Sequence, residues 1–180
     1  MNLYHYTDSA RLPWILEAGE LQPGRNKIGG FPNPDFIWAT TSPHGDRTAS
    51  GASAGYRSGD VFLVRLALST EDFFPWAEVA ERYPQWTSVH RKRLELAAGG
   101  KSDPSNWWCR EQPLRLEAIK DIQFRTYSNN IWRAAPRELH EANDGDQRWL
   151  GVEHSGMLFM SRQVVGNQGQ FGYQIGKLKA

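Results

Sequence analysis

LYHYT, residues 3–7, is the stretch on which the interpretation of the sequence depends. Its aromatic side chains favour a β-strand, and Thr7 or Asp8 follows it as a potential helix N-cap. Apolar residues at helical spacing predict a helix in the segment 12–18, and Gly19 occupies the position where glycine commonly ends a helix. The N-terminus is therefore expected to form a strand, a cap, a helix and a glycine stop.

The rest of the chain mixes strand and helix patterns. Further strand-forming runs lie at residues 36–41, 61–68, 106–111, 119–127 and 157–165. Helical patterns lie at residues 75–82, 86–98 and 136–142. Because these elements do not alternate regularly as βαβ units, the sequence predicts the α+β class. It contains no internal repeat, and the absence of a glycine-rich phosphate loop argues against a Rossmann-type dinucleotide site.

Length and composition are those of one folded domain, expected over residues 1–180. Apolar residues make up 39% of the chain and charged residues 23%, which does not indicate disorder. The net charge of +1 means that any binding of nucleic acid must come from a local basic patch. Eight Trp and six Tyr are costly to expose, so we expect some of them to line a cleft.

The sequence predicts a cytoplasmic protein that does not contact a membrane. Its apolar runs are far shorter than the roughly 20 residues that span a bilayer, and no signal-peptide pattern opens the chain. The single cysteine, Cys109, excludes an intrachain disulfide and fits a reducing compartment. We expect Cys109 to be inert packing, and no metal site is predicted.

Three segments in a fixed order carry a family resemblance. They are residues 3–7 with GELQP (19–23) behind the first helix, IWATTS (37–42), and WWCREQP (107–113). Their order resembles that of small ADP-ribosyltransferases, the superfamily that includes diphtheria-type toxins, poly-ADP-ribose polymerases and DNA-modifying bacterial toxins. The resemblance implies a split mixed or antiparallel β-sheet core with flanking helices in residues 1–127. Residues 128–180 would then form an extension packed on that core.

The same resemblance implies a site for NAD as co-substrate, with no metal. His5 would hold the nicotinamide ribose and the amide end. Glu111 would complete the site by bonding the ribose and polarising the acceptor. The other residues implied in NAD binding are Tyr6, Thr7, Arg25, Trp38, Thr40 and Thr41.

Glycosidic chemistry explains these residue types. Breaking the bond between ribose and nicotinamide creates an oxocarbenium-like centre that a carboxylate stabilises. Glu111 could also accept the acceptor's proton as a general base. Strand alternation places Glu111 on the face of Trp107 and Cys109, whereas Gln112 lies on the other face, and the sequence leaves open which of the two faces the cleft.

The acceptor is expected to be a macromolecule, with DNA or RNA favoured over protein. Arg91 and Arg93, in the basic run 90–93, are the candidate acceptor-binding residues, although such a run on a helix is usually a solvated face. Arg25 in the glycine-rich loop could neutralise phosphate, and Arg65 needs a partner within an apolar run. A toxin-like enzyme, with a potential antitoxin partner, fits a small NAD-consuming chain.

Two alternatives remain open from the sequence. The chain could be a non-catalytic module that binds a nucleotide, RNA or a protein through the same aromatic cleft. It could also be an NAD-dependent RNA 2′-phosphotransferase of the related fold, although the basic residue set of that family is not evident.

Overall fold

The structure, a computed structural model, describes residues 1–24, 30–45, 54–100 and 102–180. It contains α and β structure with mostly antiparallel strands, as the sequence predicts. The described residues group into two compact units, each built from several segments. The first unit comprises Met1–Tyr6, Leu21–Gly51 and Leu66–Lys120. The second comprises Thr7–Glu20, Ala52–Arg65 and Asp121–Ala180.

The first unit is a small sheet flanked by helices. Its strand order is β5-β6-β3-β1-β4. Its strands are β1 (Asn2–Asp8), β3 (Ile37–Thr40), β4 (Leu63–Ser69), β5 (Phe74–Pro75) and β6 (Trp107–Arg110), and β1 and β4 each run on into the second unit. The short strand β7 (Leu114–Arg115) lies outside this sheet. The helices are α4 (Val79–Arg82) and α5 (Ser88–Ala98), with 3₁₀ turns η1 (Thr70–Asp72), η2 (Trp76–Glu78), η3 (Pro104–Asn106) and η4 (Leu116–Ala118).

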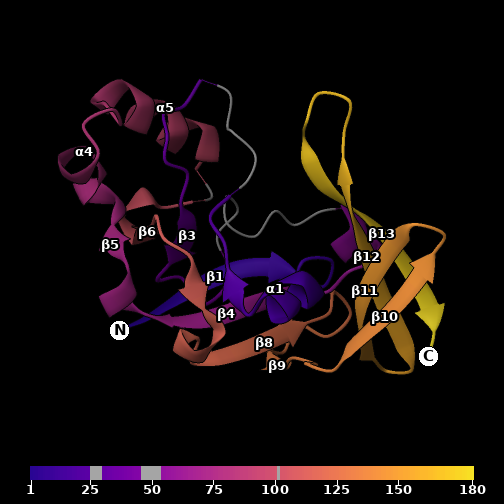
Figure 1. Cartoon of the computed structure of the whole chain (residues 1–180). Coiled ribbons are helices and arrows are strands. Elements are labelled where there is room, and N and C mark those ends of the chain that lie inside the picture. Colours follow the sequence, from indigo (N-terminus) through magenta and orange to yellow (C-terminus); the bar gives the residue numbers. More distant parts are fainter. Residues whose placement is uncertain (25–29, 46–53, 101) are drawn as a thin grey trace. The chain divides into compact units, whose positions relative to one another are not determined.

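Strand β3 lies between β1 and β6, and both pairings are antiparallel (Figure 1). Thr40 is opposite Tyr4 on β1 and Trp107 on β6. Trp38 is opposite Cys109 on β6. Because directly opposed residues in a ladder point to the same face, the side chains of Trp38 and Cys109 share one face of this sheet.

An aromatic core fills that face and packs under α4 and α5. Its buried members are Phe36, Phe74, Trp76, Val79, Trp86, Ala98, Trp107 and Cys109. The indole N–H groups of the buried tryptophans are satisfied: Trp76 donates to Glu95 at 2.8 Å, Trp86 to the Pro34 carbonyl at 3.2 Å, and Trp107 to Ser102 at 3.1 Å. Since a buried N–H without an acceptor is costly, these contacts explain how the unit tolerates so much tryptophan.

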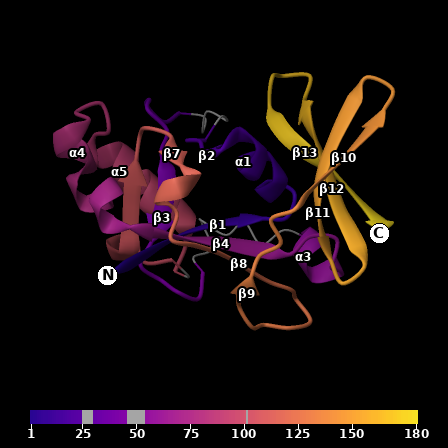
Figure 2. The same ribbon diagram turned by 60° about the horizontal axis from the view of Figure 1, so that its bottom comes forward.

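The second unit contains two sets of strands. The smaller set has the order β4-β8-β9, with β8 (Asp121–Arg125) and β9 (Arg133–Ala134). The larger set is an antiparallel meander of β10 (Leu139–Asp144), β11 (Gln147–His154), β12 (Met157–Val165) and β13 (Phe171–Lys179), visible as one twisted ribbon in Figure 2. The helices are α1 (Leu12–Ala18) and α3 (Ala54–Ser58), and β2 (Glu20–Leu21) begins in this unit.

The strand, the helix and the glycine stop predicted at the N-terminus are confirmed, but the predicted cap is wrong, because the N-cap of α1 is Arg11 and no side chain caps the helix. Helix α1 ends at Ala18, and Gly19 adopts the left-handed conformation with φ of 70°. The Asp8 carboxylate accepts hydrogen bonds from the backbone N–H groups of Ala10 at 3.0 Å and Arg11 at 3.1 Å. Asp8 therefore stabilises the turn that leads into the helix, as its residue type predicts.

The helix predicted at residues 136–142 is wrong. Residues Leu139–Asp144 form strand β10, which pairs along its whole length with β11. A two-residue connection containing Gly145, with φ of 59°, joins the two strands. Helix propensity gives way here to the cross-strand ladder, whereas the strand predicted at residues 157–165 is confirmed as β12.

Ser161 joins α1 to the meander inside the second unit. Its hydroxyl is fully buried, donates to the Ala10 carbonyl at 2.6 Å and accepts from the Trp14 indole N–H at 2.9 Å. One hydroxyl thus satisfies a donor and an acceptor that come from the start of α1 and the loop before it.

Among the described residues, no helix is long and apolar enough to cross a membrane.

Replacing Ser161 by alanine is therefore expected to lower the free energy of unfolding by about 1–3 kcal/mol, because it leaves an indole N–H and a carbonyl unpaired. Urea unfolding of the S161A protein measures this. The control is Ser88→Ala at an exposed position on α5. A change in S161A no larger than that of S88A would show that the hydroxyl does not hold α1 in place.

Candidate functional site

The three segments that carry the family resemblance lie on neighbouring strands of the first unit. His5 is on β1, Trp38 on β3, and Glu111 directly follows β6. The strand order β6-β3-β1 places the three strands side by side, although they are far apart in the sequence. The ladder therefore brings these candidate residues to one small sheet.

His5 is held by a backbone contact to the neighbouring strand. Its Nδ1 lies 2.7 Å from the Trp38 carbonyl oxygen. A carbonyl can only accept, so Nδ1 carries the hydrogen, and Nε2 of the neutral ring is an acceptor. This contact fixes the orientation of the half-buried imidazole.

The Trp38 side chain is partly buried against the aromatic core. Its ring centroid lies 5.2 Å from that of Trp76 and 6.2 Å from that of Trp107. Its indole N–H donates to Asp35 Oδ1 at 3.1 Å, and the same oxygen accepts from the Phe36 backbone N–H at 2.7 Å. Asp35 thus fixes the orientation of the indole at the start of β3.

Glu111 has a hydrogen-bond partner that the sequence analysis missed. The Tyr83 hydroxyl donates to Glu111 Oε2 at 2.8 Å. Tyr83 ends α4, and its ring packs against Phe36 with centroids 5.3 Å apart. Burial, together with the hydrogen bond to Glu111 and its negative charge, raises the pKa of Tyr83 to about 12. No sequence spacing links positions 83 and 111, since only the fold brings the turn after α4 to the end of β6.

Glu111, rather than Gln112, contacts the aromatic face. Gln112 is exposed, and its carbonyl accepts from Arg110 Nε at 2.9 Å. Arg110 also donates to the carbonyls of Asp72 at 2.9 Å and Pro113 at 3.1 Å. These bonds fix the backbone just after β6 and hold Glu111 on the side of Trp107 and Cys109.

Three of the remaining predicted NAD-binding residues, Tyr6, Thr40 and Thr41, make side-chain hydrogen bonds within the protein, whereas Thr7 does not. The Tyr6 hydroxyl donates to the Ser42 carbonyl at 2.7 Å. Thr40 is fully buried, and its hydroxyl accepts from the Ser42 backbone N–H at 3.1 Å. The Thr41 hydroxyl donates to Asn106 Oδ1 at 2.7 Å. Thr7, on the part of β1 that belongs to the second unit, is 6% exposed, and its hydroxyl oxygen has no hydrogen-bond partner.

The candidate basic residues Arg25, Arg91 and Arg93 do not share one environment. Arg25 lies outside the described residues. Arg91 on α5 lies 5.9 Å from the Trp76 ring centroid and 3.9 Å from Glu95, so it packs on the aromatic core. Arg93 is exposed and lies over the Phe31 ring at 5.0 Å.

Arg65 has the partner that its apolar surroundings require. In the second unit its Nε donates to Gln123 Oε1 at 2.7 Å, and its guanidinium lies 4.3 Å from the Trp132 ring centroid. Cys109, in the first unit, is fully buried, and desolvation raises the pKa of its thiol well above the ordinary value, which favours the unreactive neutral form. Within the described ranges, no cluster of His, Cys, Asp or Glu is arranged to hold a metal ion.

Comparisons of the chain with protein-family models, curated proteins and solved structures find no significant match. The functional argument therefore depends on the geometry of these residues.

The contact between Tyr83 and Glu111 predicts a late tyrosine titration. The folded state favours the neutral phenol, through burial first and the bond to Glu111 second, so the protein loses stability through this group as the pH rises from about 10 to about 12. NMR titration of the tyrosine Cζ carbons, with Tyr83→Phe for assignment, measures the pKa. Glu111→Gln should bring it closer to 10 while leaving part of the shift, because burial is the largest cause. An unchanged Tyr83 pKa in E111Q would contradict the contact.

Proposed function

We propose that the chain is an NAD-dependent ADP-ribosyltransferase that transfers ADP-ribose to a macromolecular acceptor. The observation that carries this proposal is the adjacency of β6, β3 and β1, which brings His5, Trp38 and Glu111 to one sheet in the unit that contains them. These are the residues that the family resemblance assigns to NAD, and their adjacency does not follow from sequence order alone.

The donor set of these residues fits the nicotinamide end of NAD. His5, whose ring is oriented by the contact of Nδ1 with the Trp38 carbonyl, supplies an imidazole for the nicotinamide ribose. The partly buried Trp38 supplies an apolar aromatic surface on the neighbouring strand, and the register of Tyr4 against Thr40 places its ring on the other face of the sheet from His5. The Glu111 carboxylate supplies negative charge on the face of the aromatic core. Together they provide a ribose contact, a stacking surface and an anion.

The chemistry needs positioning and charge. When the bond between ribose C1′ and nicotinamide nitrogen breaks, its electron pair leaves with nicotinamide, and an acceptor oxygen or nitrogen then bonds to C1′. Glu111 stabilises the positive charge that develops on the ribose, and it accepts the proton that the acceptor releases. Tyr83 holds this carboxylate in place through the bond to Oε2. His5 fixes the sugar so that one face of C1′ is open to attack.

The proposal favours a nucleic acid as the acceptor of ADP-ribose. A protein acceptor is the alternative. The biological role proposed with it is that of a toxin-like, cytoplasmic enzyme that an antitoxin protein neutralises. The acceptor class is decided by incubating the chain with NAD and separate pools of RNA, DNA and protein, and locating added ADP-ribose by mass spectrometry.

Nicotinamide release from NAD tests the catalytic assignment. Glu111→Gln keeps the size of the side chain but removes its charge, so the rate of release should fall about 100-fold. His5→Ala should lower the rate by a factor of about 10 to 100 through loss of ribose positioning. Glu117→Gln, at an exposed position on η4, is the matched control and should keep the wild-type rate.

The same assay separates the alternatives. A protein that binds nucleotides but releases no nicotinamide with any acceptor pool would be a binding module. Loss of a 2′-phosphate from RNA, with NAD consumed, would identify a phosphotransferase. Wild-type rates in both E111Q and H5A would reject the site altogether.

A further inference from the structure

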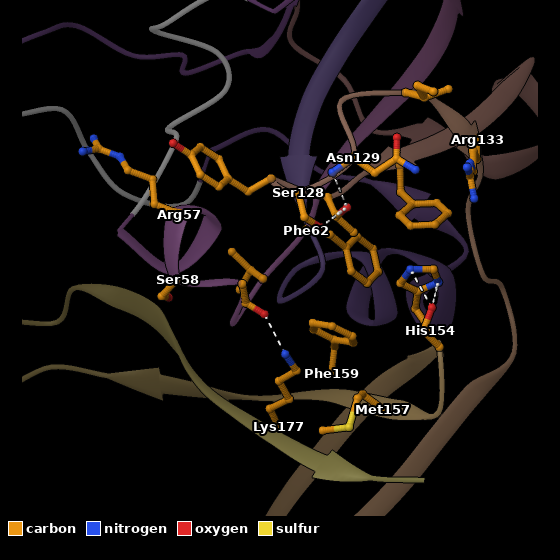
Figure 3. A pocket seen from close by; sticks show the side chains of 17 residues that line it. Arg57, Ser58, Phe62, Ser128, Asn129, Arg133, His154, Met157, Phe159 and Lys177 are labelled. Carbon is orange, nitrogen blue, oxygen red and sulfur yellow. Dashed lines mark hydrogen bonds between the residues drawn. The ribbon is translucent and has the colours of Figure 1, made fainter.

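A pocket of about 570 Å³ lies within the second unit, and nothing in the proposed NAD chemistry uses it. This volume is within the range of about 300–1,000 Å³ that is typical of small-ligand sites. Figure 3 shows the side chains around it. Among them are Phe62, Phe124, Phe159, Tyr127, Arg57 and Arg133.

Aromatic rings form the inner wall of the pocket. Phe62 packs edge to face on both Phe124 and Phe159, each pair with centroids 5.0 Å apart. The His154 ring packs on Phe124 with centroids 4.6 Å apart. Burial, and after it the charge of Arg133, lower the pKa of His154, so its neutral ring belongs to this aromatic wall at neutral pH. These phenylalanines are almost fully buried, with Phe62 1% and Phe159 7% exposed, so they form an apolar floor of which only a small part is open to a ligand.

The outer wall is cationic. Arg57 on α3 and Arg133 on β9 are exposed and lie on opposite sides of the pocket in Figure 3. Lys177 on β13 donates from Nζ to the Gly59 carbonyl at 2.9 Å and lies 5.1 Å from the Phe159 ring centroid. Among the described residues that line the pocket, none is Asp or Glu. The pocket therefore attracts anions although the net charge of the chain is only +1.

Two large apolar side chains are exposed where they line the pocket. Tyr127 is 59% exposed and Ile131 is 62% exposed. The Tyr127 ring is held edge to face against Tyr56, with centroids 5.5 Å apart and planes at 87°. A tyrosine with an exposed face is suited to stack on a flat ring. Ser128 and Asn129, next to it, add polar groups that can bond a base edge.

We propose that this pocket binds a nucleotide of a single-stranded nucleic acid, with the base against Tyr127 and the aromatic wall and the phosphates between Arg57 and Arg133. Single-strand binding sites combine these two features, stacking aromatic rings and cations along the backbone. A duplex keeps its bases stacked inside and offers no free face to Tyr127. If the proposed transferase activity also holds, the strand bound here is its acceptor.

Fluorescence anisotropy with labelled oligo-dT and oligo-U, without NAD, tests this site. The wild-type protein should bind one or both strands, and a duplex more weakly. Tyr127→Ala should weaken binding about tenfold by loss of stacking. Arg133→Gln should also weaken binding and reduce the slope of log K against log salt by about 0.7, the value for one lost phosphate contact on a single strand.

Matched controls separate the pocket from general surface charge. Arg137→Gln removes an exposed arginine outside the pocket, and Val165→Ala removes an exposed apolar side chain, 70% exposed, on β12. Both should bind as the wild type does. The assignment would be overturned by equal losses in the controls or by a lack of binding to any strand. It would also be overturned if AMP or a phosphopeptide bound as tightly as the oligonucleotide. The binding assay contains no NAD. Strand binding by the wild type that is lost in Y127A and R133Q would therefore support the pocket assignment even if the protein never releases nicotinamide.

Discussion

The backbone ladder on both edges of β3 is the constraint on which the first unit depends. With β1 on one side and β6 on the other, the register of Thr40 against Tyr4 and of Trp38 against Cys109 decides where every candidate side chain points. A shift of one residue in either pairing would reverse the faces, because side chains alternate along a strand. It would also move the Trp38 carbonyl away from His5. The aromatic core resists such a shift, since it fits only one set of faces.

Local signals were sufficient for much of the fold. Gly19 ends α1 because the left-handed conformation costs glycine little, and that preference is visible in the sequence. Strand β6 is short and apolar on one face, so its pattern is also local. By contrast, strand alternation alone could not decide between Glu111 and Gln112, because β6 ends at Arg110 and the backbone beyond it is held by the carbonyl contacts of Arg110. Tyr83, the partner of Glu111, lies 28 positions earlier, and no periodicity reports such a contact.

The C-terminal residues illustrate a different failure of local reasoning. The segment 136–142 has helix-forming residues, yet its partner strand lies immediately after it, and a six-pair ladder with β11 outweighs a weak propensity. The next turn has positive φ at both Ser155 and Gly156, the geometry that matches the twist of a tight hairpin. A pocket drawn from α3, β8, β9 and three strands of the meander leaves no motif in the sequence. Its cationic character is equally invisible in a chain whose charges nearly cancel.

Nearly balanced charge is compatible with two opposite electrostatic tasks. Glu111 supplies negative charge where a cationic sugar would form, whereas Arg57 and Arg133 supply positive charge around an acid-free pocket. Each effect operates over a few ångströms, and exposed charges beyond about 8–10 Å are largely screened at physiological salt. The net charge of the chain therefore carries little information about either site. What matters is the local arrangement of each unit: in one, a ladder brings a carboxylate to the aromatic face, and in the other, arginines of α3 and β9 lie around buried phenylalanines.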